Sequence, residues 1–189
     1  MAAMNISLGV RPVGPELVVG VGDCRTTAFP VRTLATYALG SCIAVIGWDW
    51  KVRAGGLLHV MLPDSSMDRT GGGAVGNPFL YVDTGVPELL RRLEAMGAAR
   101  TRLRWCMAGG ANMMADSTSF EIGKRNHLAL KRAFWKAGLF VDSEEVGGND
   151  SRSVRLDLES GRVDLRRGVG SGRALMPGRM ALNLERGSK

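Results

Sequence analysis

Cys42 is the residue whose surroundings are best suited to covalent chemistry. It follows Gly40 and Ser41 and directly precedes the apolar, β-branched segment 43–48. Glycine allows a tight bend at the point where a buried strand would begin. Because N–H groups at such a bend can point to one position in space, they suit a developing oxyanion. We expect the turn at Gly40 and Ser41, through the N–H groups of Ser41 and Cys42, to serve this purpose.

His59 is the obvious base for Cys42, since a cysteine nucleophile needs a nearby base or cation to form its thiolate. It lies in the apolar segment 54–62. If segments 43–48 and 54–62 pair as an antiparallel hairpin, the start of the first lies near the end of the second. Cys42 and His59 would then be close together. The pattern alone leaves a structural role open for both residues, because a buried free cysteine is usually inert.

A tight turn after the apolar segment 103–108 is a further candidate for the site. Gly109 and Gly110 form this turn, and Asn112 follows. The turn either serves backbone geometry alone or brings backbone groups and Asn112 against the site. The sequence leaves these two roles open.

Several further segments must fold around these residues. Alternating or β-branched apolar patterns predict strands, and apolar residues at helical spacing predict helices. The expected strands are 17–22, 43–48, 54–62, 103–108, 139–141, 154–158 and 163–165, with two hairpins among them. The expected helices contain 89–96 and 130–137, whereas 23–32 and 64–78 are expected to be irregular. The glycines of 64–78 predict no phosphate loop, because the required Gly-Lys-Ser/Thr ending is missing.

The composition is that of an ordinary folded protein of 189 residues, with 45% apolar and 23% charged residues. No stretch approaches the roughly 20 apolar residues that cross a bilayer, and we see no secretory signal. Three widely spaced cysteines predict a reducing cytoplasm rather than disulfides, and we interpret Cys24 and Cys106 as structural. Nothing predicts a zinc site. We divide the chain into a loose arm (1–15), one domain (16–167) and a flexible basic tail (168–189).

The chain resembles the chemoreceptor glutamine deamidases of the CheD family in five ordered segments within roughly residues 17–166. The first two contain Thr36, Cys42 and His59 at matching separations, and the ordered set is far more specific than any one segment. The segments are TYALGSC from 36, GGLLHVMLP from 55, GGANM from 109, IGKRN from 122 and GGN from 147.

The resemblance implies an enzyme that converts specific glutamine side chains of methyl-accepting chemotaxis receptors to glutamate. It implies Cys42 as nucleophile, His59 as base and acid and Thr36 as a supporting polar residue, without metal or cofactor. It implies an α+β fold in which a β-sandwich-like core of mixed sheets is flanked by helices, similar to the catalytic domains of deamidating bacterial toxins. The implied partners are the cytoplasmic helical region of the receptors and, for some members, a CheC-type phosphatase.

Three alternatives stay open at this stage. The chain could be a catalytically silent module that binds a receptor or phosphatase, although the intact set of Thr36, Cys42 and His59 argues against this. It could hydrolyse receptor glutamate methyl esters by the same thioester chemistry. The net charge of +7 could attract nucleic acid, but aromatic residues make up only 6% of the chain and no stacking platform is apparent. The charge is read more simply as an aid to docking on an acidic, helical receptor.

Overall fold

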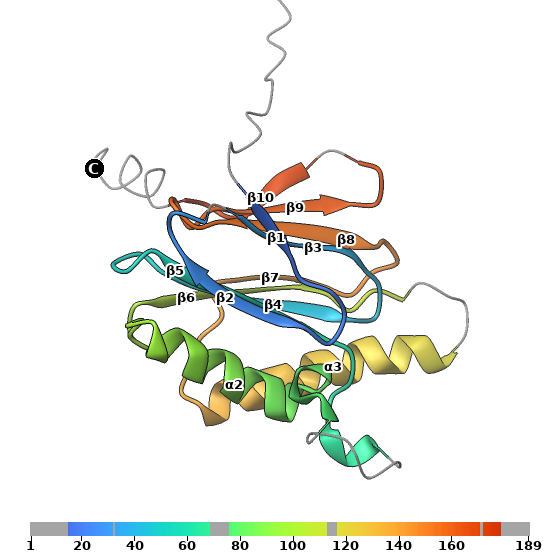
Figure 1. Cartoon of the computed structure of the whole chain (residues 1–189). Helices are drawn as coiled ribbons and strands as arrows, with labels where there is room; N and C mark the ends of the chain where they lie inside the picture. The colour runs from blue at the N-terminus through green and yellow to red at the C-terminus, as the bar shows by residue number, and fades with distance from the viewer. Residues whose placement is uncertain (1–14, 32, 69–75, 113–116, 171, 179–189) are drawn as a thin grey trace, which may run out of the picture.

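The computed structural model describes residues 15–31, 33–68, 76–112, 117–170 and 172–178, with side chains of the 117–170 segment described from 122 onward. Two five-stranded sheets stack on each other, and two helices cover the outer face of one of them (Figure 1). The expected α+β sandwich with flanking helices is therefore confirmed. No helix in these ranges combines the length and the apolar character needed to cross a membrane.

Sheet A contains the first strand and the C-terminal strands. Its order is β1 (Glu16–Val18), β3 (Thr33–Leu39), β8 (Arg152–Asp157), β9 (Val163–Arg167) and β10 (Gly172–Met176). The pair β1 and β3 is parallel, and the other neighbours are antiparallel. The predicted hairpin at 154–165 is present as β8 and β9.

Sheet B contains the strands on which the candidate nucleophile and base lie. Its order is β2 (Cys24–Ala28), β5 (Ala54–Val60), β4 (Ile43–Asp49), β6 (Leu103–Gly109) and β7 (Ser143–Val146). Only β6 and β7 pair in parallel among these neighbours. The predicted hairpin of 43–48 with 54–62 is confirmed as β4 and β5.

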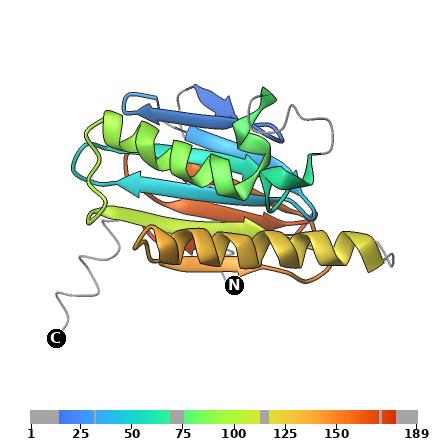
Figure 2. The same cartoon turned by 90° about the horizontal axis from the view of Figure 1, so that it is seen from below.

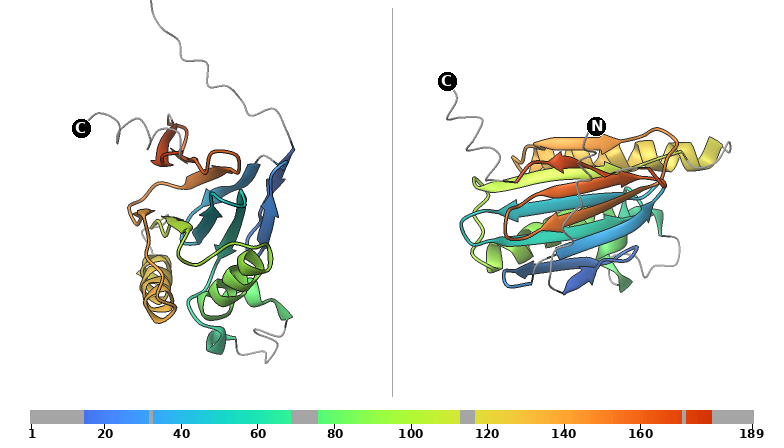
Figure 3. Two further views of the ribbon diagram at one scale, coloured as in Figure 1. Left: turned by 90° about the vertical axis from the view of Figure 1, so that its left-hand side faces the viewer. Right: turned by 90° about the horizontal axis from the view of Figure 1, so that it is seen from above.

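The helices lie side by side on the face of sheet B that is turned away from sheet A (Figures 2 and 3). They are α2 (Val82–Ala95) and α3 (Ser117–Lys136), and short 3-10 turns at Ser65–Met67 (η1) and Pro78–Leu80 (η2) precede α2. Both helices confirm the predicted apolar spacing. Gly97 and Gly138, just beyond their ends, adopt positive φ angles, as is typical where a helix stops.

Strand β4 is buried on both faces, which explains its unbroken apolar sequence. Ile43 and Val45 pack toward the helices, in a core that also contains Leu89, Leu93 and Trp105. Ala44, Ile46 and Trp48 pack toward sheet A, in a second core with Leu34, Leu156 and Leu165. The alternation assigns each β4 side chain to one of two cores, so the register of β4 also fixes which way the residues before it project.

Four sequence predictions differ from the structure. Segment 23–32 is not irregular throughout: Cys24–Ala28 form β2, whose two threonines pair with Gly55 and Gly56 of β5 although they lack an apolar signal. The strand expected over 17–22 ends at Val18 because a turn follows. Segment 139–141 is not a strand: the N–H of Leu139 bonds the Phe134 carbonyl at 2.9 Å and closes the end of α3.

The fourth difference concerns the C-terminal tail. Gly172–Met176 form β10, an edge strand on β9, so this part of the expected flexible tail is ordered. Leu175 and Met176 are buried in the core between the sheets, and this burial outweighs the surrounding glycine and basic residues. Residues 1–14 of the predicted arm and 179–189 of the tail lie outside the described residues, as does 69–75 of the predicted loop.

Candidate functional site

The β4–β5 register places Cys42 and His59 on the same face of sheet B. Ala44 lies opposite His59, and Ile43 lies opposite Val60. Cys42 is two residues before Ala44 and therefore projects to the same side, where it packs against the core between the sheets. Such diagonal neighbours have Cα atoms about 7–8 Å apart, within reach of long side chains. The sequence expectation that the hairpin brings these residues together agrees with this register.

Thr36 approaches His59 from the other sheet. Its hydroxyl lies 2.9 Å from Nδ1 of His59 and 2.7 Å from the carbonyl oxygen of Val19. A hydroxyl has one hydrogen, so when Thr36 donates to Val19 it accepts a hydrogen bond from the imidazole Nδ1–H. This assignment satisfies all three groups and leaves Nε2 as the unprotonated nitrogen of His59.

The free nitrogen of His59 is a buried polar atom without a partner. His59 is 2% exposed, and its Nε2 has no hydrogen bond among the described residues. Burial lowers the pKa of His59 to about 4, opposed in part by the Val19 carbonyl. Burial raises the pKa of the Cys42 thiol, opposed by its own backbone N–H. Both groups are therefore neutral at pH 7, and the imidazole is a free base on the face of sheet B to which the protonated Cys42 thiol projects.

An irregularity in β3 leads the chain from Thr36 into the turn of Gly40, Ser41 and Cys42, which we call the nucleophile turn after the role expected for Cys42. The pairing with β8 shifts between Thr36 and Leu39. Ala38, inside this bulge, has a φ of 54°, a left-handed conformation that costs a residue with a side chain about 1–3 kcal/mol. Bulges and strained backbone are often found beside functional sites because they redirect the chain.

The turn at Gly109 and Gly110 lies directly against the nucleophile turn. The N–H of Gly110 donates to the Cys42 carbonyl at 2.8 Å, and the N–H of Ala111 donates to the Gly40 carbonyl at 2.7 Å. Gly109 has a φ of 125°, and a Cβ there would lie 2.2 Å from the Cys42 oxygen. No other residue fits this contact. Gly109 and Gly110 therefore hold the backbone of Cys42 in place.

Asn112, the other residue predicted to line the site, follows this turn. Its N–H donates to the Gly148 carbonyl at 2.7 Å, whereas its Oδ1 is buried and has no partner in the described part of the chain. This backbone hydrogen bond links the Gly109-Gly110 turn to the Gly147-Gly148 segment. Two of the segments that carry the family resemblance are therefore in contact.

Asn126 was not identified as a site residue from the sequence, yet it joins the two halves of the site. It is fully buried on α3, and its Nδ2 donates to the carbonyls of Ser41 at 3.3 Å and Met61 at 2.9 Å. The first carbonyl belongs to the nucleophile turn and the second follows the strand of His59. A signal was available in the sequence. Asn126 lies in the same helical stripe as the buried residues Leu130 and Phe134, and a buried amide side chain requires hydrogen-bond partners.

Arg152 also contacts these glycine turns, and the sequence analysis did not identify it. This buried arginine donates to the carbonyls of Gly109 at 3.4 Å and Gly147 at 2.5 Å, and pairs with buried Glu145 at 3.3 Å. Burial lowers its pKa, with the charge of Arg167 acting in the same direction, but an arginine stays charged.

The turn formed by Gly40, Ser41 and Cys42 thus has all three carbonyls engaged, by Ala111, Asn126 and Gly110. These three hydrogen bonds fix the backbone of the turn that carries Cys42. In the described residues, no three His, Cys, Asp or Glu side chains are grouped as metal ligands would be.

Comparison with known proteins identifies the family of the chain. The family profile "CheD chemotactic sensory transduction" matches residues 61–167. A protein of Solibacter usitatus named "Probable chemoreceptor glutamine deamidase CheD" is 49% identical over 148 residues, 78% of this chain and 86% of the relative. Relatives from Methanococcus maripaludis and Syntrophus aciditrophicus, with corresponding names, are 44% identical over 155 residues (80% and 95% covered) and 40% over 148 (78% and 91%). The chain therefore belongs to the CheD family.

Proposed function

We propose that this chain is a cysteine-dependent hydrolase that deamidates specific glutamine side chains of methyl-accepting chemotaxis receptors to glutamate. The observation that carries the proposal is the free Nε2 of His59 on the face of sheet B to which Cys42 projects. Membership of a family whose relatives are named chemoreceptor glutamine deamidases supplies the substrate. We place the reaction in the cytoplasm, where the helical region of the receptors would be reached.

The proposed reaction begins with a neutral pair. Nε2 of His59 takes the thiol proton as the Cys42 sulfur attacks the carboxamide carbon of glutamine. The oxyanion is held by N–H groups of the Gly40–Ser41–Cys42 turn. The Thr36 oxygen accepts from Nδ1–H throughout, which keeps Nε2 directed to the reacting atoms.

Collapse of the tetrahedral intermediate breaks the C–N bond. His59 returns its proton to the departing nitrogen, so that ammonia leaves instead of a strongly basic amide anion. A thioester between Cys42 and the receptor side chain remains. His59 then removes a proton from water, the hydroxide attacks the thioester, and glutamate and the Cys42 thiol are released. A neutral threonine stabilises imidazolium less than an aspartate would, which suits a slow modifying enzyme.

The same thioester step extends to a second substrate. A receptor glutamate methyl ester has a better leaving group than an amide, so we propose a methylesterase side activity that would release methanol. A CheC-type phosphatase stays a predicted partner through the family resemblance.

The test is mass spectrometry of a purified receptor cytoplasmic fragment after incubation with the protein. We expect conversion of discrete glutamines to glutamate, and no conversion with Cys42→Ala. The matched control is Cys106→Ala, which removes a buried thiol from β6 and should keep the activity of its folded fraction. No conversion in several receptor fragments, with binding retained, would favour the silent module instead.

A further inference from the structure

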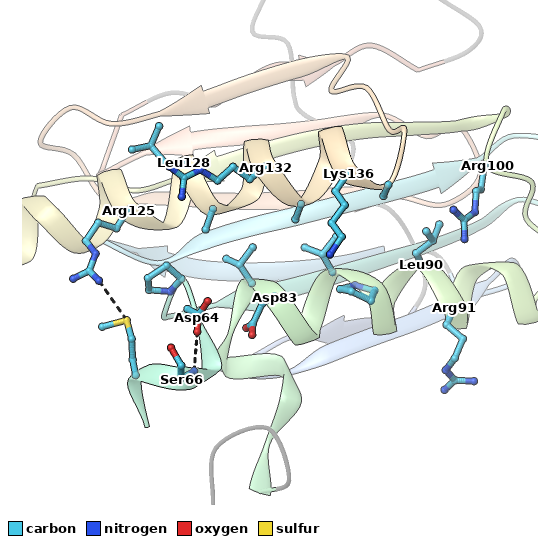
Figure 4. Close-up of a pocket in the computed structure, with 18 of the residues that line it drawn as sticks. Asp64, Ser66, Asp83, Leu90, Arg91, Arg100, Arg125, Leu128, Arg132 and Lys136 are labelled. Atoms are coloured by element: carbon cyan, nitrogen blue, oxygen red, sulfur yellow. Dashed lines mark hydrogen bonds between the residues drawn. The ribbon is translucent and has the colours of Figure 1, made fainter. Parts of the chain in front are cut away.

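A groove of about 1020 Å³ lies between α2 and α3, outside sheet B (Figure 4). Its apolar lining includes Val86 and Leu90 of α2, Ala129 and Ala133 of α3, and Ala137 just beyond the end of α3. The small alanine side chains leave room for an occupant on the α3 side. An amphipathic helix could place its apolar face in this groove, as in known helix-in-groove complexes.

The charges along the groove are distributed unequally between its two walls. On the α2 side, Arg91 pairs with Glu88 and Arg100 pairs with Glu94. On the α3 side, Arg132 and Lys136 form no ion pair with any described residue. Lys136 extends from α3 toward α2 in the close-up (Figure 4).

The remaining charged groups do not change this asymmetry. Arg125 of α3 contacts the sulfur of Met67 at 3.8 Å and forms no ion pair within the part of the chain that the structure describes. Asp83 accepts hydrogen bonds from Ser65, and Asp64 accepts one from Ser66. The α3 wall therefore presents three cations to whatever occupies the groove.

The three cations form one stripe along α3. Arg125, Arg132 and Lys136 are separated by seven and four residues, which places them on the same side of a helix. With a rise of 1.5 Å per residue they extend over about 16 Å. A helix lying along the groove with carboxylates at positions i, i+7 and i+11 would match all three.

The groove begins beside the nucleophile turn. Arg125 lines it, and the next residue, Asn126, donates to the carbonyls of Ser41 and Met61. Pro63 and Asp64, which follow the strand of His59, line the same end. A helix in the groove would therefore extend past the end of sheet B at which Cys42 lies.

We propose that this groove binds an amphipathic α-helix with carboxylates along one edge, and that this helix is the receptor segment next to the modified glutamine. The identity of the partner rests on the proposed function; the groove and its charge pattern do not. Apolar contacts along the floor supply affinity, and the α3 cations select register and direction.

The test uses a fluorescent synthetic helix with an apolar face and glutamates at i, i+7 and i+11, with binding measured by fluorescence anisotropy. A peptide of the same composition with its glutamates on the opposite edge is the first control. Arg132→Glu with Lys136→Glu should weaken binding about tenfold or more, equivalent to about 1.4 kcal/mol. Lys51→Glu with Arg166→Glu, an equal charge change on exposed residues outside the groove, should alter Kd less than twofold.

Equal binding of the two peptides, or equal weakening by the two charge-reversed pairs, would overturn the inference. The inference would also be overturned if the chain formed a dimer that dissociates in the Arg132→Glu with Lys136→Glu variant. The groove would then hold a second copy of the chain. Cys42→Ala should bind the peptide normally. Failure of the groove is therefore distinguishable from failure of the deamidase, which is read from Cys42-dependent conversion of receptor glutamines.

Discussion

The two ends of β4 bury polar groups in opposite ways. At its C-terminal end, Asp49 is fully buried, and its carboxylate accepts from the N–H groups of Lys51 and Ala99 and pairs with Arg102 at 2.7 Å. Burial raises its pKa, but these hydrogen bonds outweigh burial and the net shift is downward. At the other end, beside Cys42, Nε2 of His59 and Oδ1 of Asn126 have no partner in the described residues.

This difference separates polar groups that stabilise the fold from polar groups that are available to a substrate. A buried polar atom without a partner costs about 1–3 kcal/mol, so its presence needs an explanation. The hydrogen bonds and the ion pair of Asp49 stabilise the fold, whereas in the proposed reaction His59 keeps a lone pair for the proton of the Cys42 thiol. The following changes should therefore affect activity at one end of β4 and stability at the other.

The largest effect is expected for Cys42→Ala. Removing the nucleophile should lower the rate of receptor deamidation by at least about 10³-fold, because the thioester can no longer form. The free energy of unfolding should change by less than about 1 kcal/mol, since Cys42 is only partly buried. Urea unfolding and mass mapping of the receptor fragment measure the two quantities. Residual activity near that of the wild type would refute the assignment.

Asp49→Ala should show the reverse behaviour. Loss of this buried carboxylate leaves Arg102 and the N–H groups of Lys51 and Ala99 without their acceptor, and we expect a loss of about 3 kcal/mol in the free energy of unfolding. Activity per folded molecule should be unchanged. Asp164→Ala is the control, because the Asp164–Arg162 pair is about half exposed and should contribute less than about 1 kcal/mol.

Asn126→Ala should lower kcat by about 10²-fold with little change in KM. The substitution removes the side-chain amide that joins the Ser41 and Met61 carbonyls, so the backbone at Cys42 and His59 can shift. Small displacements of reacting groups have effects of this size. Alkylation of Cys42 should slow in parallel, a change that simple destabilisation of α3 would not produce at low temperature. Asn149→Ala, on the exposed turn, serves as the control. An unchanged kcat would remove Asn126 from the positioning machinery.

Stability should fall as the pH is lowered, through His59. Its pKa is about 4 in the folded protein and about 6.5 when unfolded. Between these values the unfolded state binds a proton that the folded state does not, so stability present above pH 6.5 is lost toward pH 4. We expect a loss of about 2 kcal/mol between pH 7 and 5. His59→Asn should lack this component, and an identical pH profile for the variant would contradict the assignment.

The smallest effect is expected at Thr36. Thr36→Val keeps the shape but removes the acceptor of the Nδ1–H bond, and kcat should fall about tenfold, the equivalent of one hydrogen bond. Thr36→Ser, which keeps the hydroxyl, should restore most of the rate. If valine and serine behaved alike, the hydroxyl would have no part in orienting His59.

Much of the fold and the central residues could be predicted from the sequence. The apolar runs of β4 and β5 gave their pairing, and the pairing placed Cys42 near His59. Strand β2 could not be predicted, because its two threonines are ordered by the glycine backbone of β5 rather than by apolar burial. The contacts of Asn126 and Arg152 depend on carbonyls from distant segments, and no local pattern records which carbonyl a side chain will reach.

The most direct test of the central claim is the rate at which iodoacetamide alkylates the three cysteines at pH 7, followed by peptide mapping. Burial raises the pKa of Cys24 to about 12 and raises that of Cys106 as well, so neither should react quickly. We predict that Cys42, the partly buried thiol, is alkylated much faster than both, and that His59→Asn slows the alkylation of Cys42 without changing the other two rates. Equal rates for the three thiols, or a Cys42 rate unaffected by His59→Asn, would contradict a reactive Cys42–His59 pair.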